Sequence, residues 1–348
     1  MIALAIVRRL VLCLGVLGST TFAEAVHAQQ GGHAALMQQR GQHPLNATIG
    51  LPAVASRPIG HAEWQVAVEH ANSFMGGVRE REILLLDGES TELVVRHRRR
   101  LGACWQGEAT LPFVAHSDGW ADRAIDDWHR LFGLPDAERG TFPLFDLNYV
   151  WLDARGRRRE LVEPTAGLGD VQVAVQRGLR CRGGGDRASG ANADTIVRIG
   201  IKLPSGDPDV LHGSGATDAY VDLQSPIWSL GRRLNAGATI GALAPGDSVL
   251  FADQRPLVLY GAAGLELRLR PRWRALAQLD WRTPFHDSAL RELGEPAATL
   301  GVGLRYLVGA RGHVEFSIGE DALIDTTPDI VARLAWTWRP ARRLPPPP

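Results

Sequence analysis

Hydrophobic and polar residues alternate with a period of two along most of the chain from residue 64 onward. The clearest example spans Leu257 to Arg282, where Pro271 separates two alternating runs. Leucine, glycine and alanine share one face of the first run, and tryptophan stands at both ends of the apolar face of the second. This alternation predicts two long antiparallel β-strands joined by a tight turn, each with one apolar and one charged face.

The same alternation recurs in further segments of the chain. Repeated segments of this kind, when they follow a signal peptide, are typical of a transmembrane β-barrel. A closed barrel satisfies every backbone polar group in lipid without helices. We therefore expect an all-β, antiparallel transmembrane β-barrel of about 12–14 strands. The alternation is weakest in the strands near 83 and 157, and without them the count is twelve. A soluble β-sandwich also alternates, but it explains less well the strand length, the charge density and the terminal tryptophans. The predicted strands begin near residues 64, 83, 101, 144, 157, 168, 193, 216, 232, 256, 272, 297, 311 and 329.

The N-terminus has the features of a secretory signal peptide. Arg8 and Arg9 precede the apolar run 10–17, and small-x-small cleavage sites follow up to Ala28. We expect removal of residues 1–28, a periplasmic or plug segment at 29–62, a barrel at 63–339 and a proline-rich tail at 340–348. The predicted location is the outer membrane of a Gram-negative bacterium.

Charge composition excludes a bulk electrostatic attraction to nucleic acid, because Lys+Arg and Asp+Glu both total 38. Lys202 is the only lysine. On the polar faces of the strands both signs occur, with arginine in excess. In an open pore this excess would favour anions, whereas in a closed lumen the charges would pair and fill the interior. The residues predicted to face the lumen are Arg198, Lys202, Glu266, Arg268, Arg270, Arg272, Arg274, Asp280, Arg282 and Arg305.

Residues 115–143 form the longest predicted connection, and strand parity places it outside the cell. Its stretch 120–132 predicts one short amphipathic helix. The acidic and histidine residues could suggest a metal or acid/base site. The interfacial tryptophans favour a cap or lid over the barrel mouth instead, so we expect no metal, cofactor or catalytic residue. The candidate cap residues are His116, Asp118, Trp120, Asp122, Asp126, Trp128 and His129.

Two cysteines remain after the signal peptide, Cys104 and Cys181. In an exported protein they can form a disulfide, or they can be two unpaired small residues. Strand parity places both near the periplasmic rim.

Several segments together resemble an uncharacterised Gram-negative family, domain of unknown function 3187. They are "GLP" at 50–52, "EHANSF" at 69–74, "LLLDGES" at 84–90, 111–135, "GLGDVQVAVQ" at 167–176, 201–223, 278–294 and 320–336. The segments "GLGD" and "KLPSGD…GSGATD" are also similar to outer-membrane barrels linked to the phenol meta-cleavage pathway. These resemblances imply an outer-membrane barrel, in some members thought to pass hydrophobic compounds, and supply no catalytic residues.

The sequence as a whole favours a passive channel or transporter for a small, potentially hydrophobic solute. Two alternatives stay open. One is a structural or interaction barrel with a closed lumen and loop 115–143 as its contact surface. The other is a lipid-modifying enzyme, which is disfavoured because no Gly-x-Ser-x-Gly motif occurs. The expected partners are outer-membrane lipid, the barrel-assembly machinery and a small-molecule solute, with no nucleic acid.

Overall fold

The computed structural model describes residues 36–39, 41–54, 59–119, 146–181, 194–251, 253–322 and 326–341. The predicted signal peptide and most of the proline-rich tail lie outside these residues. So does the predicted loop helix, with Trp120, Asp122, Asp126, Trp128 and His129.

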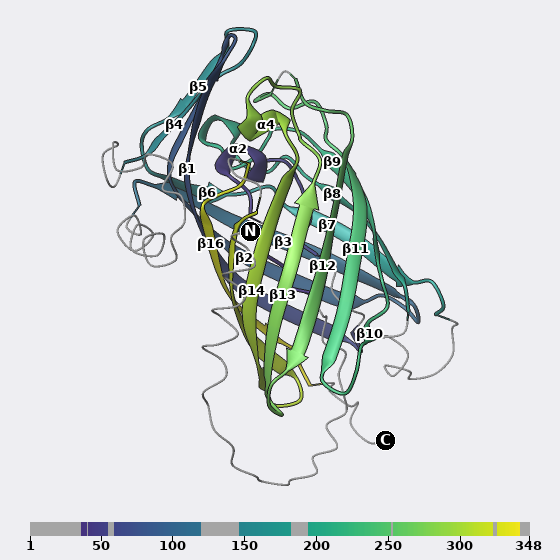
Figure 1. Ribbon diagram of the computed structural model, residues 1–348. Coiled ribbons are helices and arrows are strands. Elements are labelled where there is room, and N and C mark those ends of the chain that lie inside the picture. Colours follow the sequence, from purple (N-terminus) through teal and green to yellow (C-terminus); the bar gives the residue numbers. More distant parts are fainter. Residues whose placement is uncertain are drawn as a thin grey trace, which may run out of the picture.

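The described chain is mostly β-strand, and twelve strands form a closed antiparallel barrel (Figure 1). The barrel closes because β1 pairs with β2 on one side and with β16 on the other. This confirms the predicted all-β antiparallel barrel at the lower end of the expected strand number. The wall strands are β1 (Ala62–Arg79), β2 (Glu82–Arg100), β3 (Trp105–Ser117), β7 (Gln172–Gly178), β8 (Ile196–Lys202), β9 (Asp218–Gln224), β11 (Leu234–Ala244), β12 (Val258–Arg268), β13 (Trp273–Arg282), β14 (Ala297–Val308), β15 (Gly312–Asp321) and β16 (Ile330–Trp338).

Four short strands lie outside this ring. β4 (Asn148–Leu152) and β5 (Arg158–Leu161) form a hairpin that pairs with the upper part of β2, at Ile83–Asp87. The predicted strands near 144 and 157 are therefore extensions of the sheet and not wall strands, which corrects the higher count. Their side chains alternate like those of a wall strand because one face of the hairpin covers an apolar cluster at the barrel mouth. The other two are β6 (Thr165–Leu168), which pairs with β3, and β10 (Trp228–Ser229), which pairs with β11.

The two ends of the barrel differ in the length of their connections. Turns such as 269–272 and 309–311 join strands at one end, where β1 begins and β16 ends. Most connections at the other end are longer, and they include the short helices η3 (Pro208–Val210) and α4 (Arg291–Gly294); the exceptions are the tight β1–β2 turn there and the long connection 179–195 at the turn end. We call these the turn end and the loop end. No helix within the described ranges is long and apolar enough to cross a membrane.

The wall presents apolar side chains outward and polar side chains inward. On β12, Leu265 and Leu267 are 44% and 41% exposed, whereas Glu266 between them is 4% exposed. The same alternation on β16 exposes Leu334 and Trp336 and buries Arg333. This arrangement matches a bilayer outside and a polar lumen inside.

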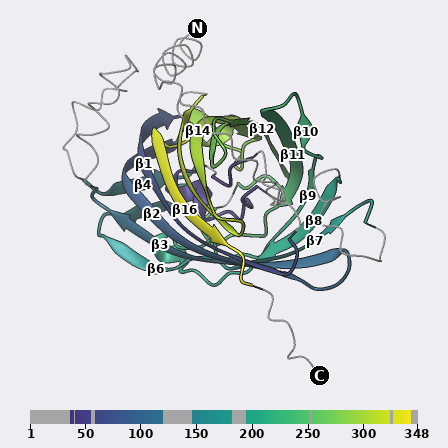
Figure 2. The same ribbon diagram turned by 90° about the horizontal axis from the view of Figure 1, so that it is seen from below.

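The described part of the N-terminal segment, residues 36–54, lies inside the ring of strands (Figure 2). It includes the short helix α2 (Pro44–Ala47), which lies toward the loop end of the barrel (Figure 1). Nearly all of its side chains are buried. The lumen is thus occupied by the chain's own N-terminal segment.

Candidate functional site

The candidate site is the lumen, where side chains of the wall hold the N-terminal segment. Nearest the turn end, Met37 N donates a hydrogen bond to Gln278 Oε1 at 2.7 Å. Gln39 Nε2 donates to the carbonyl of Val331 at 2.8 Å. Met37 is 1% exposed, so this end of the segment is fully enclosed by the wall.

Arg305 joins the wall to the same part of the segment. Its guanidinium lies 3.0 Å from Glu266 Oε2 and 2.6 Å from Glu315 Oε2, and all three side chains are buried. Arg305 Nη2 also donates to the carbonyl of Leu36 at 3.2 Å. The two glutamates of the wall balance the charge of Arg305, as a buried arginine requires. One further N–H of the same guanidinium is left to donate to the segment.

Arg198 has the same role further along the segment. It pairs with Asp222 at 2.6 Å and with Glu108 at 3.2 Å. Arg198 Nη2 donates to the carbonyl of Ala53 at 2.7 Å. Tyr260 OH donates to Asp222 at 3.1 Å, which satisfies a further lone pair of this buried carboxylate.

Lys202 is the third anchor. Its Nζ lies 2.8 Å from Asp170 Oδ2 and 2.9 Å from Asp218 Oδ2, it also donates to Ser214, and its side chain is 1% exposed. Nζ donates to the carbonyl of Thr48 at 2.8 Å. The backbone N–H of Gly50 donates to Asp218 Oδ2 at 2.8 Å. One lysine and its carboxylates therefore bind both a carbonyl and an N–H of the segment.

Gly50 lies too close to the wall for any side chain. A Cβ at this position would be 2.7 Å from both Cβ and Cδ of Lys202, closer than real Cβ contacts. Glycine is required because the backbone of the segment packs directly on the lysine stem.

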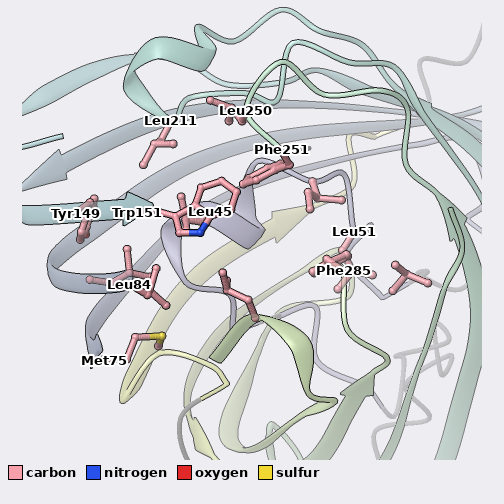
Figure 3. Packing of buried hydrophobic residues seen from close by; sticks show 14 of the residues in the cluster. Leu45, Leu51, Met75, Leu84, Tyr149, Trp151, Leu211, Leu250, Phe251 and Phe285 are labelled. Carbon is pink, nitrogen blue, oxygen red and sulfur yellow. The ribbon is translucent and has the colours of Figure 1, made fainter. Parts of the chain in front are cut away.

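An apolar cluster closes the loop end around α2 (Figure 3). Leu45, Ile49 and Leu51 of the segment belong to one buried cluster with residues of the hairpin and of the loop-end connections. Burial of such side chains is the main favourable contribution to packing here. Among the labelled members in Figure 3, the hairpin contributes Trp151, and the loop-end connections contribute Leu211, Leu250, Phe251 and Phe285.

Two buried histidines lie at the contact between α2 and the wall. His43 caps α2 by accepting from Asn46 N at 3.4 Å, and Asn46 Oδ1 lies 3.2 Å from His286 Nε2. Burial, together with the charge of Arg282, lowers the pKa of His43 well below its usual value. Burial and Arg282 also lower the pKa of His286 to about 3. Both imidazoles are thus neutral in the folded protein at neutral pH.

Acidification should therefore destabilise the folded barrel. The unfolded chain takes up protons on these histidines below about pH 6.5, while the folded protein resists uptake on His286 down to about pH 3. Stability is fully present above pH 6.5 and falls as the pH drops through this window. The unfolding midpoint, followed by heat-modifiable gel mobility, should decrease from pH 7 to pH 4. His286→Gln should flatten this decrease; an identical slope in both proteins would contradict the assignment.

The structure places most predicted lumen charges inside the barrel. Arg198, Lys202, Glu266, Arg282 and Arg305 are buried there. Asp280 and Arg274 are half-buried on the same inward face of β13.

Three other predicted lumen charges need correction or qualification. Arg268 is exposed at the very end of β12. Arg270 and Arg272 lie in the turn 269–272, beyond the paired strands, so they do not face the lumen. The alternation continues through this turn in the sequence, although the wall ends at Arg268 and resumes at Trp273.

His116 and Asp118 are the two candidate cap residues within the described ranges. His116 is 2% exposed on the inward face of β3. Its Nδ1 lies 2.9 Å from Ser90 Oγ, and its Nε2 lies 3.3 Å from the carbonyl of Leu211. Asp118 is exposed just after β3. Among the described residues, no group of His, Cys, Asp or Glu side chains is arranged to hold a metal ion.

Some residues that hold the segment could not be recognised in the sequence. Asp170 follows a glycine, and a Gly-Asp pair is typical of an ordinary turn, yet Asp170 pairs with Lys202. Glu108 lies on the alternating strand β3, with no feature that predicts contact with Arg198. A lone lysine among arginines was the one visible signal, because Lys202 binds the carbonyl of Thr48 and packs against Gly50.

Cys104 and Cys181 form a disulfide at the turn end. It links the β2–β3 turn to the segment after β7, across a sequence separation of 77 residues. Crosslinks of this span stabilise by up to about 4–5 kcal/mol in the chain-entropy model. Cys104→Ser/Cys181→Ser should lower the urea midpoint of unfolding accordingly. Reductant should also change the gel mobility of the fully denatured wild type; unchanged mobility would argue against the bridge.

The closed wall, the apolar exterior and the polar, occupied lumen define a twelve-strand β-barrel of the outer-membrane type. A family model described as protein of unknown function DUF3187 matches residues 12–339. The chain therefore belongs to the DUF3187 family, which confirms the resemblance seen in its motifs. Among curated proteins, none matches the sequence.

A solved outer-membrane channel shares the fold. The COG4313 outer membrane channel from Pseudomonas putida F1 is 14% identical, with a TM-score of 0.54, over 81% of this chain and 96% of that chain. The CymD monoaromatic hydrocarbon channel is 10% identical, with a TM-score of 0.41, over 86% and 97%. The P. putida toluene transporter TodX is 9% identical, with a TM-score of 0.39, over 82% and 92%.

Proposed function

We propose that this protein is a passive outer-membrane channel for a small solute, with residues 36–54 as a displaceable plug. The turn end faces the periplasm and the loop end faces outward, in the membrane of a Gram-negative bacterium. Short periplasmic turns and longer outer loops are usual for such barrels. The observation that carries the proposal is the occupation of the lumen by a segment that the wall holds only through non-covalent contacts, namely hydrogen bonds and apolar packing.

The charge distribution supports a removable plug. His43 is the only ionisable side chain among the described residues of the segment. Two buried arginines that contact the segment are paired within the wall, Arg305 with Glu315 and Arg198 with Asp222. Departure of the segment's described residues therefore takes no charged counter-ion away from the wall, and among them the costly step of unpairing buried charges is avoided.

The apolar cluster at the loop end supports an apolar or amphipathic solute. With α2 displaced, Trp151, Phe251 and Phe285 would line the outer part of the lumen. Small-molecule sites are usually concave and apolar, with few polar groups that fix orientation. CymD is described as a monoaromatic hydrocarbon channel and TodX as a toluene transporter. A similar solute class is our proposal for this chain.

A closed structural barrel is the second candidate. It is favoured by charged pairs on the inner face of the wall, where Arg333 lies 3.5 Å from Glu69 and 3.7 Å from Glu315. In that case loop 115–143 would serve as the contact surface for a partner.

Single-channel recording in planar bilayers separates the two. The mature wild type should show infrequent openings, and a variant that lacks residues 36–54 should show a steady current. A variant that lacks only residues 342–348 is the matched control and should behave like the wild type. Heat-modifiable mobility establishes that each barrel is folded. A folded but silent deletion variant would contradict the channel proposal and support the closed barrel.

A further inference from the structure

Among the described residues at the turn end of the barrel, the exposed side-chain charges are all positive. Three consecutive turns along the wall carry exposed arginines. They are Arg232 and Arg233 before β11, Arg270 and Arg272 before β13, and Arg311 before β15. The whole chain has a formal net charge of zero, so this concentration is a local feature and not a consequence of composition.

Further exposed arginines lie where wall strands begin or end. Arg99 lies near the end of β2, Arg177 near the end of β7, and Arg268 at the end of β12. Arg180 follows β7 in the adjoining connection. Together with the turn arginines they form a band, which we call the arginine rim.

The carboxylates at this end do not neutralise the rim. Within its described segments they are Glu63 and Asp194, which are 6% and 8% exposed. Glu63 pairs with Arg98 and, at 2.8 Å, with Arg339. Asp194 accepts from the backbone N–H of Arg180 at 2.9 Å. Both acids are buried and engaged locally, so the surface charge of the rim is positive.

The rim lies at the level of a membrane interface. Trp105, Trp228 and Trp273 are 46%, 48% and 41% exposed at this same end of the wall. Tryptophan concentrates where hydrocarbon meets headgroups. The guanidinium carbon of Arg177 lies 5.4 Å from the ring centroid of Trp105 on the outer surface. The arginine is therefore positioned beside the interfacial ring, at headgroup depth.

We propose that the arginine rim binds the phosphate groups of anionic phospholipids in the leaflet that surrounds the turn end. Guanidinium groups donate paired N–H bonds to phosphate oxygens, and each basic residue near an anionic membrane surface strengthens binding. The outward position of Arg99 and Arg177 favours a lipid over a soluble anion, because these side chains border the bilayer and not the lumen. The inference holds whether or not the lumen conducts.

Lipid retention tests the proposal on the folded mature protein. The protein is incubated in detergent micelles that contain equal amounts of phosphatidylglycerol and phosphatidylcholine with the same acyl chains. It is then purified again, and the lipid that it retains is measured by mass spectrometry. We expect phosphatidylglycerol to exceed phosphatidylcholine about fivefold at low salt. The excess should shrink at about 0.5 M salt, because the Debye length then falls below about 5 Å.

Matched variants locate the binding. Arg270→Gln/Arg272→Gln/Arg311→Gln should lower the excess at least about twofold. Arg79→Gln/Arg81→Gln/Arg158→Gln removes three exposed arginines at the loop end and should leave it unchanged. Equal retention of the two lipids, or an unaffected rim variant with native heat-modifiable mobility, would overturn the proposal. Displacement of the phospholipid by an equal concentration of free glycerol phosphate would overturn it too, in favour of a soluble-anion site.

Discussion

The Lys202→Met variant is expected to lose about 3–5 kcal/mol of folding free energy, the usual cost of removing one partner from a buried ion pair. Asp170 and Asp218 would remain buried without a counter-ion, with side chains 5% and 1% exposed. The carbonyl of Thr48 would also lose its donor. Urea titration of the refolded protein, read by heat-modifiable mobility, measures the loss.

The charge explanation has a direct control. Lys202→Met/Asp218→Asn removes one of the two stranded carboxylates and should recover part of the lost stability. A lower midpoint in the double variant than in the single variant would show that Asp218 is needed for another reason, such as its bonds to Gly50 and Gly246. A single variant as stable as the wild type would contradict the account of this anchor.

The Gly50→Leu variant should open the channel without any change in the wall. The new side chain cannot fit against Lys202, whose Cβ would lie 2.7 Å from its Cβ. Overpacking of this kind costs about 1–3 kcal/mol. The segment can relieve that cost by leaving its site, so the open probability in planar bilayers should rise at least about fivefold.

Ala47→Leu is the matched control for this change. Ala47 is exposed on α2 in the same segment, so the larger side chain meets no wall atom that it must displace. Its open probability should equal that of the wild type. Equal currents from Gly50→Leu and Ala47→Leu, both folded, would show that the segment does not gate the lumen.

The wall was predictable because a barrel imposes one periodicity on every strand. Inward and outward positions follow from alternation alone, so Arg198, Glu266 and Arg305 could be assigned from the sequence. Alternation fails where strands end, as at Arg270 and Arg272, because a turn carries the same residue types without the pairing that orients them. It also fails for β4 and β5, which alternate because one face covers the apolar cluster.

The sequence was compatible with both an open pore and a closed lumen, so the occupied lumen could not be predicted from it alone. Segment 36–54 has no strand periodicity and almost no charge, so no residue of it predicts a partner. Many of its bonds run through backbone groups, such as the carbonyls of Leu36, Thr48 and Ala53. Backbone groups are present at every position, and only the folded wall determines which of them are bound.

A reversible tether between plug and wall tests the central claim most directly. A Cβ at Gly301 would lie 2.9 Å from Met37 Cε, so the side chains at these two positions meet, and cysteines there can be joined by a bridge that a reductant cleaves. Single-channel current from Met37→Cys/Gly301→Cys is recorded before bridging, after bridging and after cleavage, with the wild type treated identically. The account predicts openings before bridging, silence while the bridge is intact and recovery after cleavage. Unchanged openings in the bridged protein would contradict a channel gated by its own N-terminal segment.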